Sequence, residues 1–250
     1  MVFKRGGENE RVTGFSLLAA AVAPGLALLA YFYWKDRYDA EPLSMVVKLF
    51  LTGVLIVLPI MIVQRALTLW LGESPFLFSF VISSGVEEFF KWFVLFHIIY
   101  NHTEFDEPYD GIVYSTAVSL GFATLENVMY AFLEPITFGS LLARALLPVS
   151  GHALFGVFMG YSLGRAKFAQ GNQIRWNLWM AFLLPWFWHG LYDFLMMTVP
   201  QDWIWVIVPF MFLLWLRAIR NVNRANAVSP FRLLNRDDEV KSLATRPYSE

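Results

Sequence analysis

The sequence predicts an all-α membrane protein, a bundle of about seven transmembrane helices. Of its 250 residues, 57% are hydrophobic and only 16% are charged, whereas soluble domains carry about 25% charged residues. A transmembrane helix needs about 20 mostly apolar residues. Seven stretches meet this requirement: residues 15–34, 43–64, 76–100, 111–134, 139–164, 176–199 and 203–222. The sequence shows no alternating strand pattern and no internal repeat.

The first stretch follows Lys4, Arg5 and Arg11, as the apolar part of a signal peptide would. It is longer than such a segment and ends in the aromatic run 31–34 instead of a small-residue cleavage site. We therefore expect a retained helix. We also expect a single membrane domain over residues 1–222, followed by a polar and mobile C-terminal tail over residues 223–250.

The composition excludes several classes of function. The net charge of −1 provides no overall attraction to nucleic acid. Because the chain has no cysteine, it has no disulfide, no thiolate metal site and no cysteine nucleophile. Its serines occur neither in a nucleophile elbow nor in a lysine-paired motif, so a serine protease is not predicted.

Basic residues near the helix ends predict the orientation in the membrane. With seven spans, ten Lys and Arg residues fall on the side that carries the C-terminus and five fall on the side that carries the N-terminus. Cytoplasmic loops carry the excess of positive charge. We therefore expect the N-terminus outside and the C-terminus inside, with the acidic loop 104–110 in the cytoplasm.

Four of the seven stretches carry polar residues where hydrocarbon is expected. In chain order these residues are Glu87, Glu88 and Lys91, then Glu126 and Asn127, then His152, and finally His189 and Asp193. A charge at the bilayer centre costs at least about 2.5–3.5 kcal/mol, and such residues usually mark a functional site inside the bundle. At a rise of about 1.5 Å per residue, the two-carboxylate motif, Glu126 and the two histidines lie about 12–20 Å from the outer helix ends. The sequence thus predicts one polar layer.

The carboxylates of Glu87 and Glu88 both lie within reach of one amine. Their spacings to Lys91 are i, i+4 and i, i+3, which place each pair on one helix face. One lysine cannot fully neutralise two carboxylates. We therefore expect one carboxylate to pair with Lys91 and the other to act as a general base on water.

The remaining polar residues allow several roles. Small residues permit close helix packing, and His152 is followed at four-residue steps by Gly156, Gly160 and Gly164. Asp193, one turn from His189, can fix the imidazole tautomer and stabilise its cation, or support a metal ligand. Glu126 can be a ligand, a water-orienting group or a structural carboxylate. Asn127 can donate to an oxyanion.

Two mechanisms remain open for these residues. His152, His189 and either Glu87 or Glu126 would supply three protein ligands, the usual composition of a catalytic zinc site. The sequence has no His-Glu-x-x-His motif, and a glutamate mechanism without metal fits the same residues. The expected cofactor is either zinc or none.

The motifs around these residues resemble those of the PrsW family of intramembrane proteases. They are Glu87-Glu88-Phe-Phe-Lys91, Phe122-xxx-Glu126-Asn127, His152-xxx-Gly156 and His189-xxx-Asp193, with further similarity at residues 23–25, 110–114, 119–127, 146–150 and 189–194. Four motifs occur in order in four successive membrane helices. The resemblance extends from about Pro24 to Arg217.

The resemblance implies a protease of the bacterial cell membrane. Members of the family make the first, site-1 cut in a single-span anti-sigma factor, RsiW, during envelope stress. By resemblance, Glu87 activates water and Glu88 pairs with Lys91. His189, supported by Asp193, is expected to polarise the scissile carbonyl, while His152 and Glu126 complete the site.

A more distant similarity links the motifs to the CAAX prenyl proteases. Here Lys91 stands one residue earlier than the arginine of that family. Glu126 stands in place of a histidine, and Asp193 in place of an asparagine. A prenylated substrate is therefore not predicted.

Two alternatives to a protease, an ion-coupled transporter and a non-catalytic membrane adaptor, explain the sequence less well. Buried carboxylates and histidines also form the proton relays of ion-coupled transporters, but transporters often contain internal repeats, which are not evident here. A non-catalytic membrane adaptor would not explain polar groups at one depth in four helices. We therefore expect a protease whose partners are a single-span membrane protein and the lipid bilayer.

Overall fold

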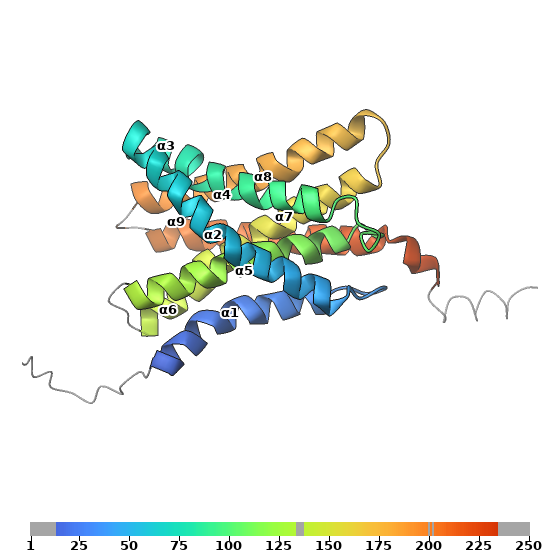
Figure 1. The fold of residues 1–250 in the computed structure, drawn as a ribbon, viewed down its shortest axis with the longest axis horizontal. Helices are drawn as coiled ribbons and strands as arrows, with labels where there is room; N and C mark the ends of the chain where they lie inside the picture. The colour runs from blue at the N-terminus through green and yellow to red at the C-terminus, as the bar shows by residue number, and fades with distance from the viewer. Residues whose placement is uncertain (1–13, 134–137, 200, 202, 235–250) are drawn as a thin grey trace, which may run out of the picture.

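The computed structural model describes residues 14–133, 138–199, 201 and 203–234, and these residues form a bundle of helices (Figure 1). The predicted all-α membrane fold is confirmed, since no strand occurs within these ranges. The basic residues Lys4, Arg5 and Arg11 lie outside the described residues, as do residues 235–250 of the expected tail.

The described helices make seven passages through the bundle. Five are single α-helices: α1 (Gly14–Trp34), α2 (Leu43–Leu71), α5 (Asp110–Leu133), α8 (Asn172–Thr198) and α9 (Trp203–Ala227). The third passage joins α3 (Pro75–Leu77), the π-helical η1 (Phe78–Ser83) and α4 (Ser84–Ile98). The fifth joins α6 (Phe138–Arg144), the π-helical η2 (Ala145–Val149) and α7 (Ser150–Lys167). The short 3-10 helix η3 (Pro230–Leu234) follows α9.

Two helices run beyond their predicted ends. Helix α2 continues past residue 64 to Leu71 and ends at Gly72, whose φ of 79° favours glycine. Helix α9 continues past residue 222 to Ala227, and Asn226 at its end is buried. The first part of the expected tail is therefore helical and packed against the bundle.

Five of the described passages are long and apolar enough to cross a membrane, namely Leu17–Trp34, Leu43–Leu71, Asp110–Leu133, Leu142–Lys167 and Trp203–Ala227. The other two passages, α3 to α4 and α8, contain the double-glutamate motif with its lysine and the His189–Asp193 pair. These ionisable residues lower the hydropathy of both passages. The two passages that are less apolar than a typical span are therefore passages that contribute to the predicted polar layer.

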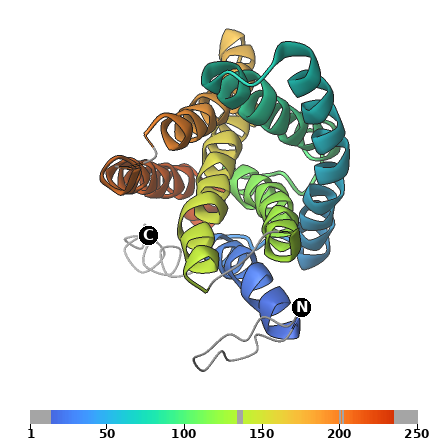
Figure 2. The same ribbon diagram turned by 90° about the vertical axis from the view of Figure 1, so that its left-hand side faces the viewer.

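Helices α5 and α7 lie at the centre of the bundle, surrounded by the other passages (Figure 2). Their close approach depends on glycine. A Cβ atom added to Gly160 would lie 2.1 Å from the carbonyl oxygen of Gly111, and one added to Gly164 would lie 2.2 Å from that of Pro108. The predicted role of the glycine stripe in packing is confirmed, and α5 is the partner.

Helix α1 begins and α9 ends at opposite ends of the bundle (Figure 1). An odd number of passages requires this arrangement, which agrees with the predicted seven. Which end faces the cytoplasm stays a prediction, drawn from the distribution of basic residues.

Candidate active site

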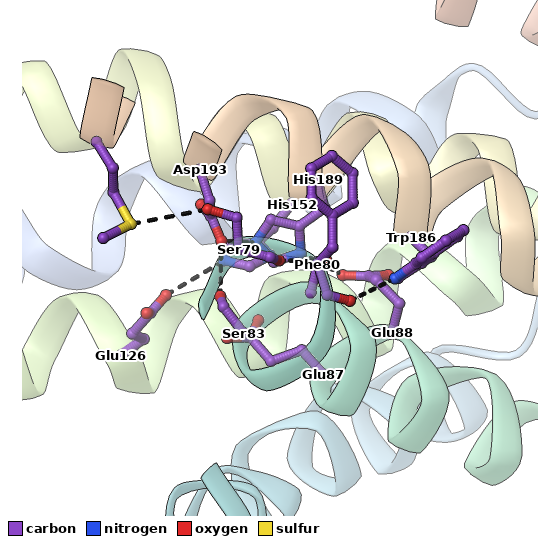
Figure 3. A network of polar contacts seen from close by, with 12 residues as sticks. Ser79, Phe80, Ser83, Glu87, Glu88, Glu126, His152, Trp186, His189 and Asp193 are labelled. Atoms are coloured by element: carbon purple, nitrogen blue, oxygen red, sulfur yellow. Dashed lines mark hydrogen bonds and ion pairs between the residues drawn. The ribbon is translucent and has the colours of Figure 1, made fainter. Parts of the chain in front are cut away.

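Polar side chains from four passages meet inside the bundle (Figure 3). They are Glu87, Glu88 and Lys91 from α4, Glu126 from α5, His152 from α7, and His189 and Asp193 from α8. Among the described residues, one candidate ligand atom from each of Glu87, Glu88, His152 and His189 lies within 4.8 Å of the others. The single polar layer predicted from the sequence is therefore present as one cluster.

Glu88 is the more tightly held of the two adjacent carboxylates. Lys91 Nζ donates to Glu88 Oε1 at 2.7 Å, and His189 Nδ1 lies 2.9 Å from the same oxygen. Glu88 and Lys91 are both fully buried. Two donors on one oxygen fix the Glu88 side chain between α4 and α8.

Glu87 is held more weakly and is slightly more accessible. Its Oε2 lies 3.4 Å from Lys91 Nζ, and its Oε1 accepts a hydrogen bond of 3.1 Å from Gln64 Nε2. The Glu87 side chain is 7% exposed, against 0% for Glu88. Gln64 was missed by the sequence analysis, although an amide in the apolar stretch 43–64 is a signal that could have found it.

His152 links the lysine to Glu126. Its Nδ1 lies 3.2 Å from Lys91 Nζ, and its Nε2 lies 3.2 Å from Glu126 Oε2. Because an ammonium group can only donate, Nδ1 must accept, and the proton of a neutral ring is then on Nε2, pointing to Glu126. The Glu126 side chain is 40% exposed, so this side of the cluster is the open one.

His189 lies between two carboxylates. Its Nδ1 faces Glu88, and its Nε2 lies 3.5 Å from Asp193 Oδ2. Ser83 Oγ donates to the same Asp193 oxygen at 2.6 Å and thereby fixes Asp193. The ring of Phe155 stacks on the imidazole, with centroids 4.8 Å apart. The predicted i, i+4 pair is present, but Asp193 is held mainly by a serine that the sequence analysis did not assign.

Both π-helical segments come directly before residues of the cluster. Segment η1 ends at Ser83, one turn before Glu87, and η2 ends three residues before His152. Around η1, Trp186 Nε1 donates to the carbonyl oxygen of Phe80 at 2.6 Å (Figure 3). Single π-helical turns occur frequently at functional sites. Here they set the direction in which the following side chains point.

Asn127, predicted as a possible oxyanion donor, makes hydrogen bonds to two other helices. Its Nδ2 donates to the carbonyl oxygen of Ala21 in α1 at 2.8 Å, and its Oδ1 accepts from Arg144 Nε at 2.9 Å. The amide hydrogen bonds of Asn127 therefore connect α5 to α1 and α6. A role as oxyanion donor stays a prediction, and in this structure both amide atoms are used in contacts between helices.

The four-residue cluster contains the donor atoms of a catalytic metal site, and in this structure Lys91 contacts Glu88 and His152 among its members. Two imidazoles and a carboxylate are a usual ligand set for catalytic zinc. Glu88 Oε2 is buried and has no hydrogen-bond partner, and a cation would satisfy it. Glu126 contacts His152 but contributes no atom to the group within 4.8 Å.

Comparison with known proteins identifies the family. Residues 41–217 match the family described as PrsW family intramembrane metalloprotease. The chain belongs to the PrsW family. It is 52% identical to Protease PrsW of Geobacillus kaustophilus over 212 residues, which cover 84% of this chain and 92% of that protein. It is also similar to Protease PrsW of Bacillus subtilis, with 46% identity over 217 residues that cover 86% and 98% of the two chains.

A more divergent relative, Protease PrsW of Clostridioides difficile, is 33% identical over 206 residues, which cover 80% of this chain and 87% of that protein. No solved structure matches the chain. The predicted resemblance to the PrsW family is thus confirmed. This PrsW family member is a multi-pass membrane protease, and the family match favours a protease over a transporter.

Proposed function

We propose that this protein makes the site-1 cut in a single-span anti-sigma factor during envelope stress, using a water molecule that Glu87 activates. The proposed role of Glu87 as the base rests on one observation: the two adjacent carboxylates differ in their contacts and in their exposure. Glu88 receives two short contacts and is fully buried, whereas Glu87 lies 3.4 Å from Lys91 and retains some exposure. Glu87 is therefore the carboxylate that can reach water.

In the proposed reaction Glu87 takes a proton from water as the water oxygen attacks the scissile carbonyl carbon. The carbonyl π electrons move to oxygen and give an oxyanion. When the C–N bond breaks, the leaving nitrogen takes the proton from Glu87, which restores the carboxylate. A positioned general base of this kind contributes about 10²–10⁴-fold in rate.

His189 is the proposed donor to the oxyanion. The distance of 3.5 Å between its Nε2 and Asp193 Oδ2 is longer than an ordinary hydrogen bond. In the imidazolium form, the Nε2–H group of His189 can therefore donate to a substrate oxygen, while the contact of Nδ1 with Glu88 keeps the ring in place. One such donor typically contributes about 2.7–4 kcal/mol to transition-state stabilisation.

The metal-dependent form of this proposal uses the same residues. A bound zinc ion would polarise the scissile carbonyl and make bound water more acidic. His152, His189 and Glu88 would hold it, since Glu88 carries the buried oxygen without a partner and Glu87 stays free as the base. Of the two carboxylates predicted as ligands, Glu87 belongs to the four-residue cluster and Glu126 lies outside it.

The depth of the cluster supports a cut near the outer boundary of the substrate. A helix in lipid has all its backbone groups paired internally, so it must unwind before a carbonyl can be attacked. Unwinding costs least near an end, where water takes over the freed hydrogen bonds. With the N-terminus outside, the nearer end is the external one, at about 12–20 Å by helix rise.

The test is cleavage of a single-span anti-sigma factor by the purified protein, with the fragments identified by mass spectrometry. We expect one cut at or just inside the external boundary, and no cut by the matched Glu87→Gln protein. A cut at the cytoplasmic boundary would contradict the proposed orientation. If the anti-sigma factor stays intact while another membrane protein is cleaved, the proposed substrate is wrong but the proposed chemistry is not contradicted.

A further inference from the structure

A second group of acidic side chains lies where α1, α2 and α5 approach one another at their ends. Asp36 follows α1, Glu41 precedes α2, Glu107 precedes α5, and Asp110 begins α5. Glu41 is 5% exposed, and Glu107 and Asp110 are 0% exposed. These four residues, which we call the acidic cluster, share no member with the active site.

The carboxyl groups of the acidic cluster face one another. Glu41 lies close enough to Asp110 for the two carboxyl groups to interact electrostatically. One oxygen from each of Asp36, Glu107 and Asp110 lies within 4.8 Å of the other two. None of the ion pairs formed within the described part of the chain includes any of the four. Several acidic groups therefore share a buried space without a basic partner.

Burial makes charge costly in this position. Buried charges in proteins are normally paired or coordinate metals. No described side chain supplies a compensating positive charge to the acidic cluster at salt-bridge distance.

Hydrogen bonds hold one oxygen of the buried carboxylates and leave another unused. Asp110 Oδ2 accepts from the backbone N–H groups of Asp106 and Glu107, at 2.8 and 2.7 Å. Ser229 Oγ donates to Glu107 Oε2. The other oxygens, Asp110 Oδ1 and Glu107 Oε1, are buried and have no hydrogen-bond partner. Both side chains are thus oriented, with one oxygen each left to bind a ligand.

A buried amide group of α9 contacts the chain next to Asp36. Asn226 is 3% exposed, and its Oδ1 is buried without a partner. Its Nδ2 donates to the carbonyl oxygen of Lys35 at 3.3 Å and to that of Val222 at 3.1 Å. The amide group therefore sits next to the backbone that carries Asp36. This observation is independent of the acidic residues and adds an uncharged oxygen.

We propose that the acidic cluster binds a hard divalent cation, Mg²⁺ or Ca²⁺, through Asp36, Glu107 and Asp110, with Glu41 and Asn226 completing the oxygen donors. Both ions prefer carboxylate and amide oxygens, and a donor set without nitrogen or sulfur disfavours zinc. The cation joins the ends of α1, α5 and α9, elements that are far apart in the sequence.

The experiment uses the full chain, purified in detergent and freed of metal with EDTA. Its thermal unfolding is followed by tryptophan fluorescence while MgCl₂ or CaCl₂ is added, with NaCl at equal ionic strength as the control. We expect a saturable rise in Tm with at least one of the two ions, about 5–10 °C at 100 times the dissociation constant. No saturable rise with either ion would overturn the proposal.

Two substitutions and one matched control assign the binding to the acidic cluster. Asp36→Asn and Glu107→Gln should each weaken cation binding by at least about tenfold. Asp39→Asn removes the same charge from the same loop at an exposed position and should bind as the wild type does. Wild-type binding by Asp36→Asn would overturn the proposal.

The melting temperature of Asp36→Asn in EDTA distinguishes the loss of a cation ligand from a general destabilisation of the fold. Asp36→Asn removes one uncompensated acidic group, so without cation it should melt at or above the wild-type temperature. A variant that melts lower in EDTA and is stabilised by cation as much as the wild type would overturn the assignment. His152→Ala should keep the full rise in Tm, since the effect does not depend on the active site.

Discussion

Replacing the two adjacent glutamates separately should give two different defects. Glu87→Gln keeps the size of the side chain and its ability to accept a hydrogen bond from Gln64, while Lys91 retains Glu88 at 2.7 Å. The fold should therefore be preserved. The general base is lost, so we expect the rate of cleavage to fall by about 10²–10⁴-fold.

Glu88→Gln removes the closest counter-charge of a fully buried ammonium group. Lys91 would retain only Glu87 at 3.4 Å and the imidazole of His152 at 3.2 Å. Breaking one partner of a buried ion pair costs about 3–5 kcal/mol. We therefore expect Glu88→Gln to lose both stability and activity.

The assay compares the two variants with the wild type in the same detergent. Cleavage of a reporter that carries a single transmembrane segment gives the rate, and thermal unfolding gives the stability. Near-normal cleavage by a folded Glu87→Gln protein would falsify the assignment of the base. A Glu88→Gln protein as stable as the wild type would show that the pair with Lys91 does not hold α4 in place.

Three further predictions concern the rest of the site and its packing. His189→Ala should lower the rate by about 10²–10³-fold and Asp193→Asn by about 10–100-fold, so equal losses in a kinetic assay would contradict a supporting role for Asp193. If zinc is the cofactor, His152→Ala and His189→Ala should both reduce the metal measured by mass spectrometry, and a fully active protein without stoichiometric metal would refute the zinc form. Gly160→Ala should destabilise the protein by at least about 1–3 kcal/mol, because its Cβ would lie 2.1 Å from a backbone oxygen of α5. Gly151→Ala, whose Cβ would meet only two ring atoms of Phe155 at 3.5 and 3.7 Å, should unfold at the wild-type temperature.

The sequence was sufficient to predict the number of helical passages and the residues that meet between them. Hydrocarbon tolerates few charges, so Glu87 and His189 stood out in apolar stretches without any knowledge of the fold. The i, i+3 and i, i+4 spacings also predicted the contacts of Lys91 with both glutamates, because these depend only on helix geometry.

Contacts between distant passages could not be predicted in the same way. Glu88 shares one oxygen between Lys91 and His189, and the second of these contacts requires knowledge of how α4 faces α8. Gln64 and Ser83 carry no charge, so each is a weaker signal in an apolar stretch than a glutamate or a histidine. From the sequence, only the loop 104–110 is recognised as acidic, because only the fold brings Asp36 next to Glu107.

The π-helical segment η1 makes the position of Glu87 sensitive to chain length as well as to residue type. A π-helical turn accommodates one more residue than the regular helix, and each residue of an α-helix advances the chain by about 1.5 Å and 100°. Deleting one residue within Phe78–Ser83 would let the segment relax to a regular helix while the residues after it kept their place. The same deletion in the regular turns after Ser84 would rotate the rest of α4 relative to α8. Tolerance of a single deletion should therefore differ sharply across this boundary.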